Sequence, residues 1–311
     1  MKVIVILFVM LGMLIASGLD TKSQKNGDFL IFTVDNKDLS IDAKMIEEAL
    51  KSNGFVIGEN ANIQAELLDI YKDNNFKIYS NISFYHKDIT LNLLKKEADA
   101  GVLVPMGMIV YQKLDEDDLH LVVVTADAQA RILGKNLQGL HDLEDAVVEV
   151  IRTLFPSAVD YYNKKRKVQE RNFLTKYTLN IKDKDADFED IREELEEEFE
   201  EKFGEAGFAM PSYFDLSDDL GEDSPYDFYV TYAICKMDVL RIVVKVEPQA
   251  AALGPCTTMI YKKKNEDKIV MGFASIYNWI NSANIEGKAS IDGLLQTQSV
   301  YENILKDVTK N

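Results

Sequence analysis

The sequence lacks most of the short motifs that identify an enzyme or a metal protein. Its 311 residues include only two cysteines and three histidines, and they contain no C-x-x-C, C-x-x-C-H, H-E-x-x-H, P-loop or G-x-G-x-x-G. The nucleophile elbow G-x-S-x-G is absent as well. These absences remove the usual signatures of zinc proteases, covalent haem proteins, nucleotide-binding enzymes and serine hydrolases.

Basic residues are scarce relative to acidic ones. The chain has 35 Lys and Arg against 52 Asp and Glu, a formal net charge of −17. Such a surface repels phosphate backbones, so we expect no nucleic-acid partner. The most acidic run, EDIREELEEEFEEKFGE, lacks the loop geometry of calcium sites. Apolar residues recur along one face of this region, which predicts a helix with solvated acids; they are Phe188, Ile191, Leu195, Phe199 and Phe203.

Long hydrophobic runs are missing except at the start of the chain. The apolar run from Val3 to Ala16 falls short of the roughly 20 residues that span a bilayer. Small residues follow it, as a signal peptidase requires. We therefore expect a signal peptide over residues 1–18 and export, in a bacterial context to the periplasm. The alternative is an uncleaved membrane anchor formed by residues 3–19, with no other membrane association.

The chain contains an internal repeat. With a fixed offset of 150, residues 79–120 align with residues 229–270 without a gap, and eleven of 42 positions are identical. Pro105 and Pro255, with Tyr111 and Tyr261, form the signature of the repeat. A period this long indicates two domain-sized copies rather than a solenoid. We predict copies at residues 27–156 and 175–311, joined by a linker at residues 157–174.

Each copy shows the same predicted order of strand, helix, strands, helix, hairpin and helix. Opening strands are expected at residues 29–35 and 176–182, central helices at 88–98 and 238–247, hairpin turns at 115–117 and 265–267, and closing helices at 143–154 and 291–308. Asp88 and Asp238 are the expected N-caps of the central helices, and Pro248 is expected to end the second. A strand should begin at each signature proline. The fold class is therefore α+β, with two antiparallel sheets, helices on one face of each, and the copies packed as a pseudo-dimer.

A Gly-Phe pair at residues 54–55 and again at 207–208, together with LGPC before a strand ending in Tyr261, resembles the DUF302 family. The second copy is the closer match, with Cys235, Pro255 and Cys256 at positions where family members carry cysteines. The first copy has Tyr85 and Met106 there. The resemblance implies a compact fold similar to the TATA-binding-protein-like class, and dimers in single-domain members. The function of the family is unknown.

Cys235 and Cys256 are the sharpest candidates for chemistry. One lies at the end of a predicted strand and the other at the start of the next strand. Three interpretations stay open: a structural disulfide, two buried free thiols, or a redox-active or metal-binding thiol pair. No cofactor is predicted, and metal ligands stay unknown. His86, His120 and His141, with Met106, could in principle hold a metal or haem, but their spacings match no known site.

Two functional hypotheses follow. In the first, the protein is exported and non-catalytic, and binds a small molecule or a protein partner at the pseudo-twofold interface or in a cleft of one half. In the second, the second copy uses Cys235 and Cys256 for thiol redox chemistry or metal binding. Trp279 is either a core residue or part of the wall of a ligand pocket.

Overall fold

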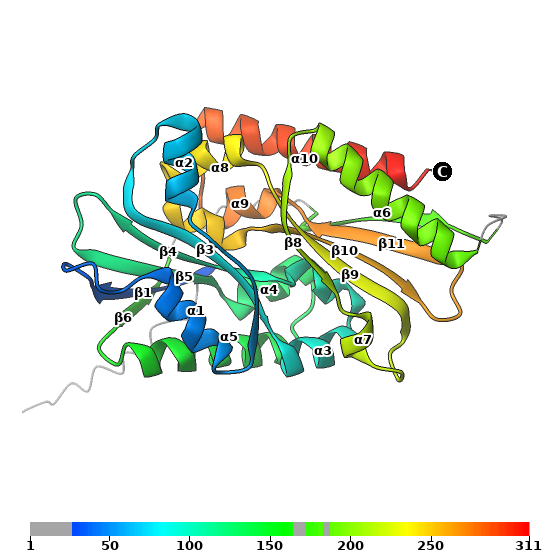
Figure 1. Cartoon of the computed structure of the whole chain (residues 1–311), viewed down its shortest axis with the longest axis horizontal. Coiled ribbons are helices and arrows are strands. Elements are labelled where there is room, and N and C mark those ends of the chain that lie inside the picture. Colours follow the sequence, from blue (N-terminus) through cyan, green and yellow to red (C-terminus); the bar gives the residue numbers. More distant parts are fainter. Residues whose placement is uncertain (1–26, 164–171, 183–186, 311) are drawn as a thin grey trace, which may run out of the picture.

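The computed structural model describes residues 27–163, 172–182 and 187–310. Within these ranges the chain forms two antiparallel sheets, one in each half (Figure 1). The predicted signal peptide (residues 1–18) and the alternative anchor (residues 3–19) lie outside them. In the described part, no helix is both long enough and apolar enough to cross a membrane.

The first half contains a six-stranded sheet in the order β2-β3-β4-β5-β1-β6. Its strands are β1 (Phe29–Asp35), β2 (Phe55–Ala61), β3 (Phe76–His86), β4 (Met106–Lys113), β5 (Asp118–Val124) and β6 (Val159–Tyr162). Its helices are α1 (Ala43–Lys51), α2 (Ile63–Tyr71), α3 (Lys87–Lys96), the 3-10 helix η1 (Ala98–Leu103), α4 (Ala126–Leu133) and α5 (Gln138–Leu154). Apolar side chains of α1 and α5 cover the outer face of this sheet.

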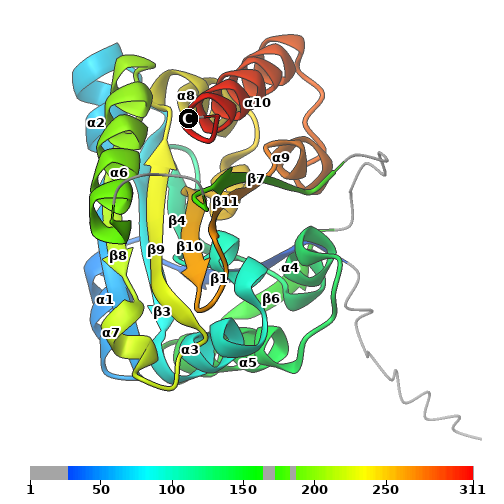
Figure 2. The ribbon, with the colours of Figure 1, turned by 90° about the vertical axis from the view of Figure 1, so that its right-hand side faces the viewer.

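The second half contains a five-stranded sheet in the order β8-β9-β10-β11-β7. Its strands are β7 (Leu174–Asn180), β8 (Ala209–Asp215), β9 (Tyr226–Cys235), β10 (Cys256–Lys263) and β11 (Lys268–Ala274). Its helices are α6 (Phe188–Glu205), α7 (Ser217–Leu220), α8 (Met237–Val244), the 3-10 helix η2 (Pro248–Leu253), α9 (Tyr277–Ser282) and α10 (Lys288–Val308). The long helices α6 and α10 cover the outer face of the sheet (Figure 2), and the predicted apolar stripe of α6 faces it.

The strand order is the same in both halves, apart from β6. The predicted α+β class and the two-copy arrangement are therefore confirmed. The strands that follow Pro105 and Pro255 and the two hairpins have the predicted places, and both prolyl peptide bonds are cis. Part of the predicted linker differs, because residues 159–162 form β6 and pair with β1 at the sheet edge. The sequence VDYY is too short to stand out as a strand.

The predicted N-caps of the central helices were wrong by two residues. His86 precedes α3, and its Nδ1 accepts a hydrogen bond of 3.5 Å from the Ile89 amide. Lys236 precedes α8 without a side-chain cap. Asp88 and Asp238 instead lie in the first helical turn, where a negative charge still favours the helix dipole. The second helix ends at Val244, and Pro248 begins η2.

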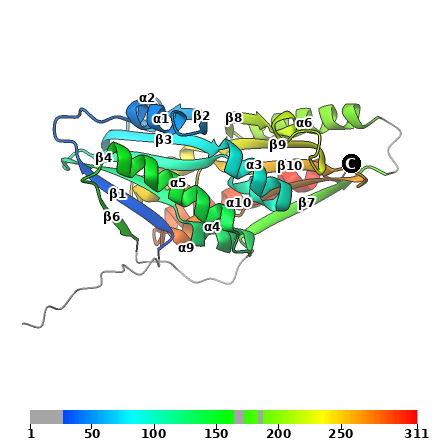
Figure 3. The same ribbon diagram turned by 90° about the horizontal axis from the view of Figure 1, so that it is seen from below.

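The inner faces of the sheets are covered by the opposite half, which makes the molecule a pseudo-dimer. The Tyr79 hydroxyl donates a hydrogen bond of 2.7 Å to the carbonyl of Pro248, and the Tyr229 hydroxyl donates one of 2.5 Å to the carbonyl of Ala98. The two bonds are related by the offset of 150 residues. Edge strands β2 and β8 also lie side by side across the junction (Figure 3). The repeated residues therefore build a reciprocal interface.

The signature tyrosines belong to this interface. Tyr111 pairs with Tyr79 across β3 and β4, and Tyr261 pairs with Tyr229 across β9 and β10. The rings of Tyr229 and Tyr261 stack with centroids 5.4 Å apart. Gly101 permits the close approach, because a methyl group at its Cα would overlap the Tyr229 hydroxyl. The repeat is thus explained by packing between halves rather than by chemistry.

Candidate functional site

A cavity of about 310 Å³ lies at the junction of the halves. From the first half, β2, α2 and β3 contribute to its wall. From the second half, β8, the end of β9, α8, α9, α10 and the start of β10 contribute. The cavity exists only because the halves are packed together, and its lining is mostly apolar.

One side of the cavity is formed by Trp279, with Val243 of α8 and Leu294 of α10. Trp279 is the only tryptophan of the chain and is 8% exposed. Of the two interpretations that the sequence left open, the structure shows both at once, because Trp279 belongs to the core and lines the cavity. Its position depends on the short helix α9.

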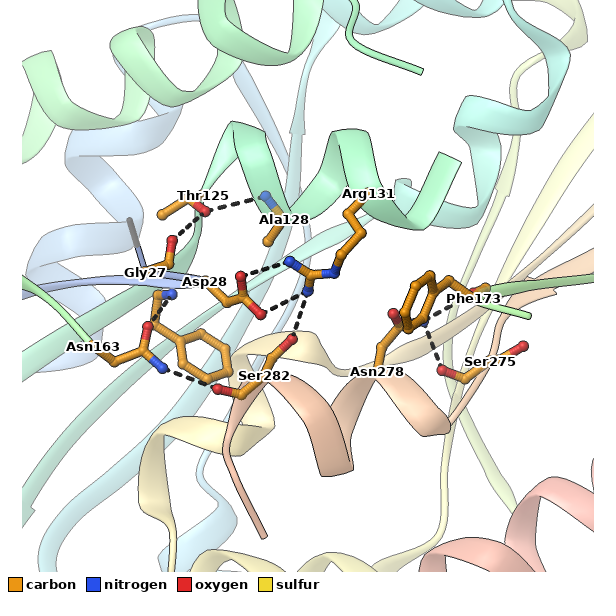
Figure 4. A network of polar contacts seen from close by, with 11 residues as sticks. Gly27, Asp28, Thr125, Ala128, Arg131, Asn163, Phe173, Ser275, Asn278 and Ser282 are labelled. Atoms are coloured by element: carbon orange, nitrogen blue, oxygen red, sulfur yellow. Dashed lines mark hydrogen bonds and ion pairs between the residues drawn. The ribbon is translucent and has the colours of Figure 1, made fainter. Parts of the chain in front are cut away.

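Helix α9 is held by polar contacts that reach both ends of the connection between the halves (Figure 4). Asn278 Nδ2 donates to the carbonyl of Phe173 at 2.9 Å, and Asn163 Nδ2 donates to the carbonyl of Ser282 at 2.9 Å. Arg131 makes two bonds to Asp28, at 2.7 and 2.6 Å, and one to Ser282 Oγ at 3.1 Å. These contacts fix the helix that carries the tryptophan.

Cys235 and Cys256 both line the cavity, and the structure holds both as free cysteines. In the observed register Cys256 pairs with Ile234. Cys235 is the next residue along β9, and consecutive strand residues point to opposite faces. Cys235 and Cys256 are therefore not direct partners in the ladder, although both line the same cavity.

The environment of the two thiols keeps them protonated. Burial raises the pKa of Cys235 to about 12 and that of Cys256 to about 12. The Cys235 sulfur lies 3.8 Å from the Met237 sulfur, and the Trp279 indole N–H hydrogen-bonds to the Cys256 sulfur. A reactive thiol needs the opposite shift, toward a stable thiolate. The raised pKa values thus give no support to a stable thiolate at either cysteine.

Two carboxyl groups face the same cavity from the first half. Glu59 lies on β2 and Glu66 on α2. Burial raises the pKa of both, and the negative charge of Glu66 raises that of Glu59 further. Within the described ranges, neither carboxylate has a hydrogen-bond or ion-pair partner. Asn81 of β3 also lines the cavity, and its Oδ1 is buried without a partner.

The equivalent region of the other half is filled. Tyr85 stands where the second half has Cys235. Phe214 stands where the first half has Ala61. The strand partners of these two residues, Asn81 for Ala61 and Thr231 for Phe214, are equivalent at the offset of 150. The Tyr85 and Phe214 rings pack edge to face with centroids 5.2 Å apart. Met106 likewise replaces Cys256. Three large side chains therefore close the space that three small ones leave open.

The three histidines have separate structural roles. His86 caps α3, His141 contacts Asn136, and His120 stacks on Tyr111 while contacting Glu116 and Thr33. Among residues that the structure describes, no group of three His, Cys, Asp or Glu is placed to hold a metal ion. The arrangement therefore gives no support to ligation by His86, His120, His141 and Met106.

Sequence reasoning missed the acidic and small residues of the cavity. Glu59 and Glu66 flank Ala61 in the segment GENANIQAELL. The offset of 153 residues that aligns the two Gly-Phe pairs also aligns Ala61 with Phe214. Comparing side-chain sizes at that offset could have indicated the cavity, because the comparison aligns the methyl side chain of Ala61 with the aromatic ring of Phe214.

Residues 32–155 match the family model described as "Domain of unknown function DUF302". These residues are a DUF302 domain. The DUF302 domain supplies Glu59, Glu66 and Asn81 to the cavity, whereas both cysteines and Trp279 lie beyond it. The likeness of the second half to the DUF302 domain rests on the shared strand order and the aligned residues.

The crystal structure of an uncharacterized conserved protein DUF302 from Bacillus stearothermophilus is 16% identical to the chain, with a TM-score of 0.35. The similarity covers 43% of this chain and 98% of that chain. Among curated proteins, no match was found.

Proposed function

We propose that the protein binds a small, mostly apolar molecule in the cavity at the junction of the halves and does not act on it chemically. The observation that carries this proposal is the cavity itself, about 310 Å³ in volume and walled by Trp279, Val243 and Leu294. A dry cavity of about 150 Å³ already binds benzene, and ligand pockets begin at about 300 Å³. The space therefore suits a molecule larger than a single ring.

The chemistry of the wall supports binding rather than catalysis. The two thiols are protonated at neutral pH, because burial raises their pKa values to about 12. A nucleophilic thiol is activated by a depressed pKa, and the pKa of both thiols is shifted the other way. We further propose that the protein works after export, since its first residues have the pattern of a signal peptide.

The binding proposal is tested with N-phenyl-1-naphthylamine, a neutral apolar dye. Trp279 is the only tryptophan, so its fluorescence reports on the cavity without interference from another indole. We expect saturable quenching in the wild-type protein. The double variant Ala61→Phe/Cys235→Tyr introduces the aromatic pair of the filled half, and should weaken dye binding by at least about tenfold.

The matched control is Leu68→Phe, which adds an aromatic ring at a side chain 46% exposed on α2 and outside the cavity. It should bind the dye like the wild type. Equal dye affinity in the filled variant and the wild type, or no saturable quenching in either, would contradict the proposal. A melting temperature for each variant shows that the comparison is made on folded protein.

Export is tested by the mass of the protein recovered from the cells that produce it naturally. A mature chain that begins at Leu19 supports a cleaved signal peptide. Retention of Met1 in a membrane fraction supports the anchor formed by residues 3–19 instead. An intact chain in the soluble cell interior would contradict both forms of the proposal.

A further inference from the structure

The polar atoms of the cavity that lack a partner are acceptors of hydrogen bonds. The Asn81 side-chain nitrogen faces the carbonyl groups of Ala251 and Gly254 at 3.5 and 3.4 Å. These two carbonyls fix the orientation of the amide, because the opposite orientation would place oxygen against oxygen. The Oδ1 atom is therefore left as a buried acceptor without a donor.

The two carboxylates are acceptors of the same kind. Among the described residues that line the cavity, Lys236 is the only cation, and it contacts neither acid. Its Nζ donates to the carbonyl of Ala206 at 2.6 Å and lies 4.6 Å from the centre of the Phe208 ring. Glu59 and Glu66 thus face an apolar space as a half-buried pair of like charges without a compensating cation.

Burying such charges without a partner is unfavourable, and a ligand that brings positive charge and several N–H donors would remove the cost. An ammonium group has three donors and no acceptor, which matches two carboxylates that only accept. The net charge of −17 would also attract a cation toward the protein. Two carboxylates are too few oxygen ligands for a calcium site, which takes about six to eight.

We propose that the natural ligand is an apolar molecule with one protonated amino group, which Glu59 and Glu66 receive. This inference rests on the proposed function and names the ligand class for the same cavity. The apolar part of the molecule lies against Trp279 and its neighbours. The amino group lies toward the first half, so one ligand contacts both halves.

The test compares three probes of nearly the same shape: 1-naphthylmethylamine, 1-naphthylmethanol and 1-naphthoate. Isothermal titration calorimetry at neutral pH and low salt measures the affinity of each. We expect the amine to bind the wild-type protein at least about tenfold tighter than the alcohol, because a charge-assisted hydrogen bond is stronger than a neutral one. The carboxylate should bind most weakly.

The variant Glu59→Gln/Glu66→Gln keeps the side-chain shapes and removes both charges. It should reduce the ratio of amine to alcohol affinity to about one, with little change for the alcohol. The control Glu193→Gln/Glu197→Gln removes two exposed charges from α6, outside the cavity, and should keep the ratio of the wild type. This control separates local contacts from the general attraction of an acidic protein.

The outcomes distinguish the two proposals. If the alcohol binds as tightly as the amine, or if the glutamine variant keeps the amine preference, the inference about the ligand class is wrong. The proposed function still stands in that case, provided the neutral dye quenches Trp279. If neither the dye nor any naphthyl probe binds, the proposed function is wrong as well.

Discussion

The two halves of the molecule have the same strand order and the same reciprocal tyrosine contacts, yet they differ at the junction. Around the strand ends of the first half, Tyr85 and Met106 together with Phe214 of β8 fill the space. At the equivalent positions around the second half, the side chains are Cys235, Ala61 and Cys256, and a cavity remains. The packing of the halves is thus symmetric, whereas the cavity occurs on one side only.

This difference separates residues that hold the halves together from residues that shape the site. Tyr79 and Tyr229 occur in both halves because each half needs the same contact to cover its inner sheet face. The residues around the cavity are under no such requirement. A position that differs in size between the halves therefore indicates the site better than one that is repeated.

Thiol reactivity gives the largest expected effect. Burial raises the pKa of both cysteines from 9.0 to about 12, so the thiolate fraction near neutral pH should be about a thousandfold below that of an unperturbed thiol. Alkylation by iodoacetamide should be correspondingly slow, and should accelerate about tenfold per pH unit from neutral pH to about pH 9.

Denatured protein is the control for this measurement, since both cysteines should then react at the ordinary rate. Fast alkylation of the native protein would show that the open half exposes its sulfurs. It would restore the hypothesis of a thiol-redox or metal-binding pair.

Opening the filled half tests the comparison directly. The variant Tyr85→Cys/Phe214→Ala copies the small side chains of the open half, and should lower the free energy of unfolding by at least about 3 kcal/mol. The reason is that two rings in mutual contact are removed, one of them the buried ring of Tyr85. Chemical denaturation measures the change.

The reverse variant, Ala61→Phe/Cys235→Tyr, serves as the counterpart. Its free energy of unfolding should stay within about 1.5 kcal/mol of the wild-type value, because the added rings enter existing space. A large loss in both variants would mean that the two junction regions are not equivalent in packing.

The smallest effects are expected at the repeated tyrosines. Tyr79→Phe and Tyr229→Phe each remove one buried hydroxyl and leave a carbonyl without its donor, which should cost about 1–2 kcal/mol of unfolding free energy each. The two losses should be equal and should add in the double variant. Urea denaturation of the three proteins checks this, and unequal losses would show that the interface is less symmetric than its geometry.

Much of the fold could be predicted from the sequence, because apolar periodicity and the repeat carry strong local signals. The stripe of α6 and the strands after Pro105 and Pro255 are examples. The N-caps were predicted less well. Asp88 fits a cap by residue type, but the backbone enters the helix at His86, and that entry depends on where β3 ends.

The site could be predicted only in part. Cys235, Cys256 and Trp279 were recognised as notable residues, and all three line the cavity. Glu59, Glu66 and Asn81 were not, because they come from the other half. These residues approach Cys235 only because the two sheets pack against each other, and no local sequence pattern predicts that packing. The role of Tyr79 and Tyr229 could not be predicted either, since each contacts a segment about 170 or 130 residues away.

The covalent connection of the halves has a consequence for the number of sites. A homodimer of identical chains would carry the same residue at both positions that Tyr85 and Cys235 occupy here, so its two sites would be both filled or both open. In one continuous chain every molecule has one filled region, at Tyr85, and one cavity, at Cys235. A ligand that enters this cavity therefore has no twin site with which to cooperate, and its binding curve should have a Hill coefficient of about one.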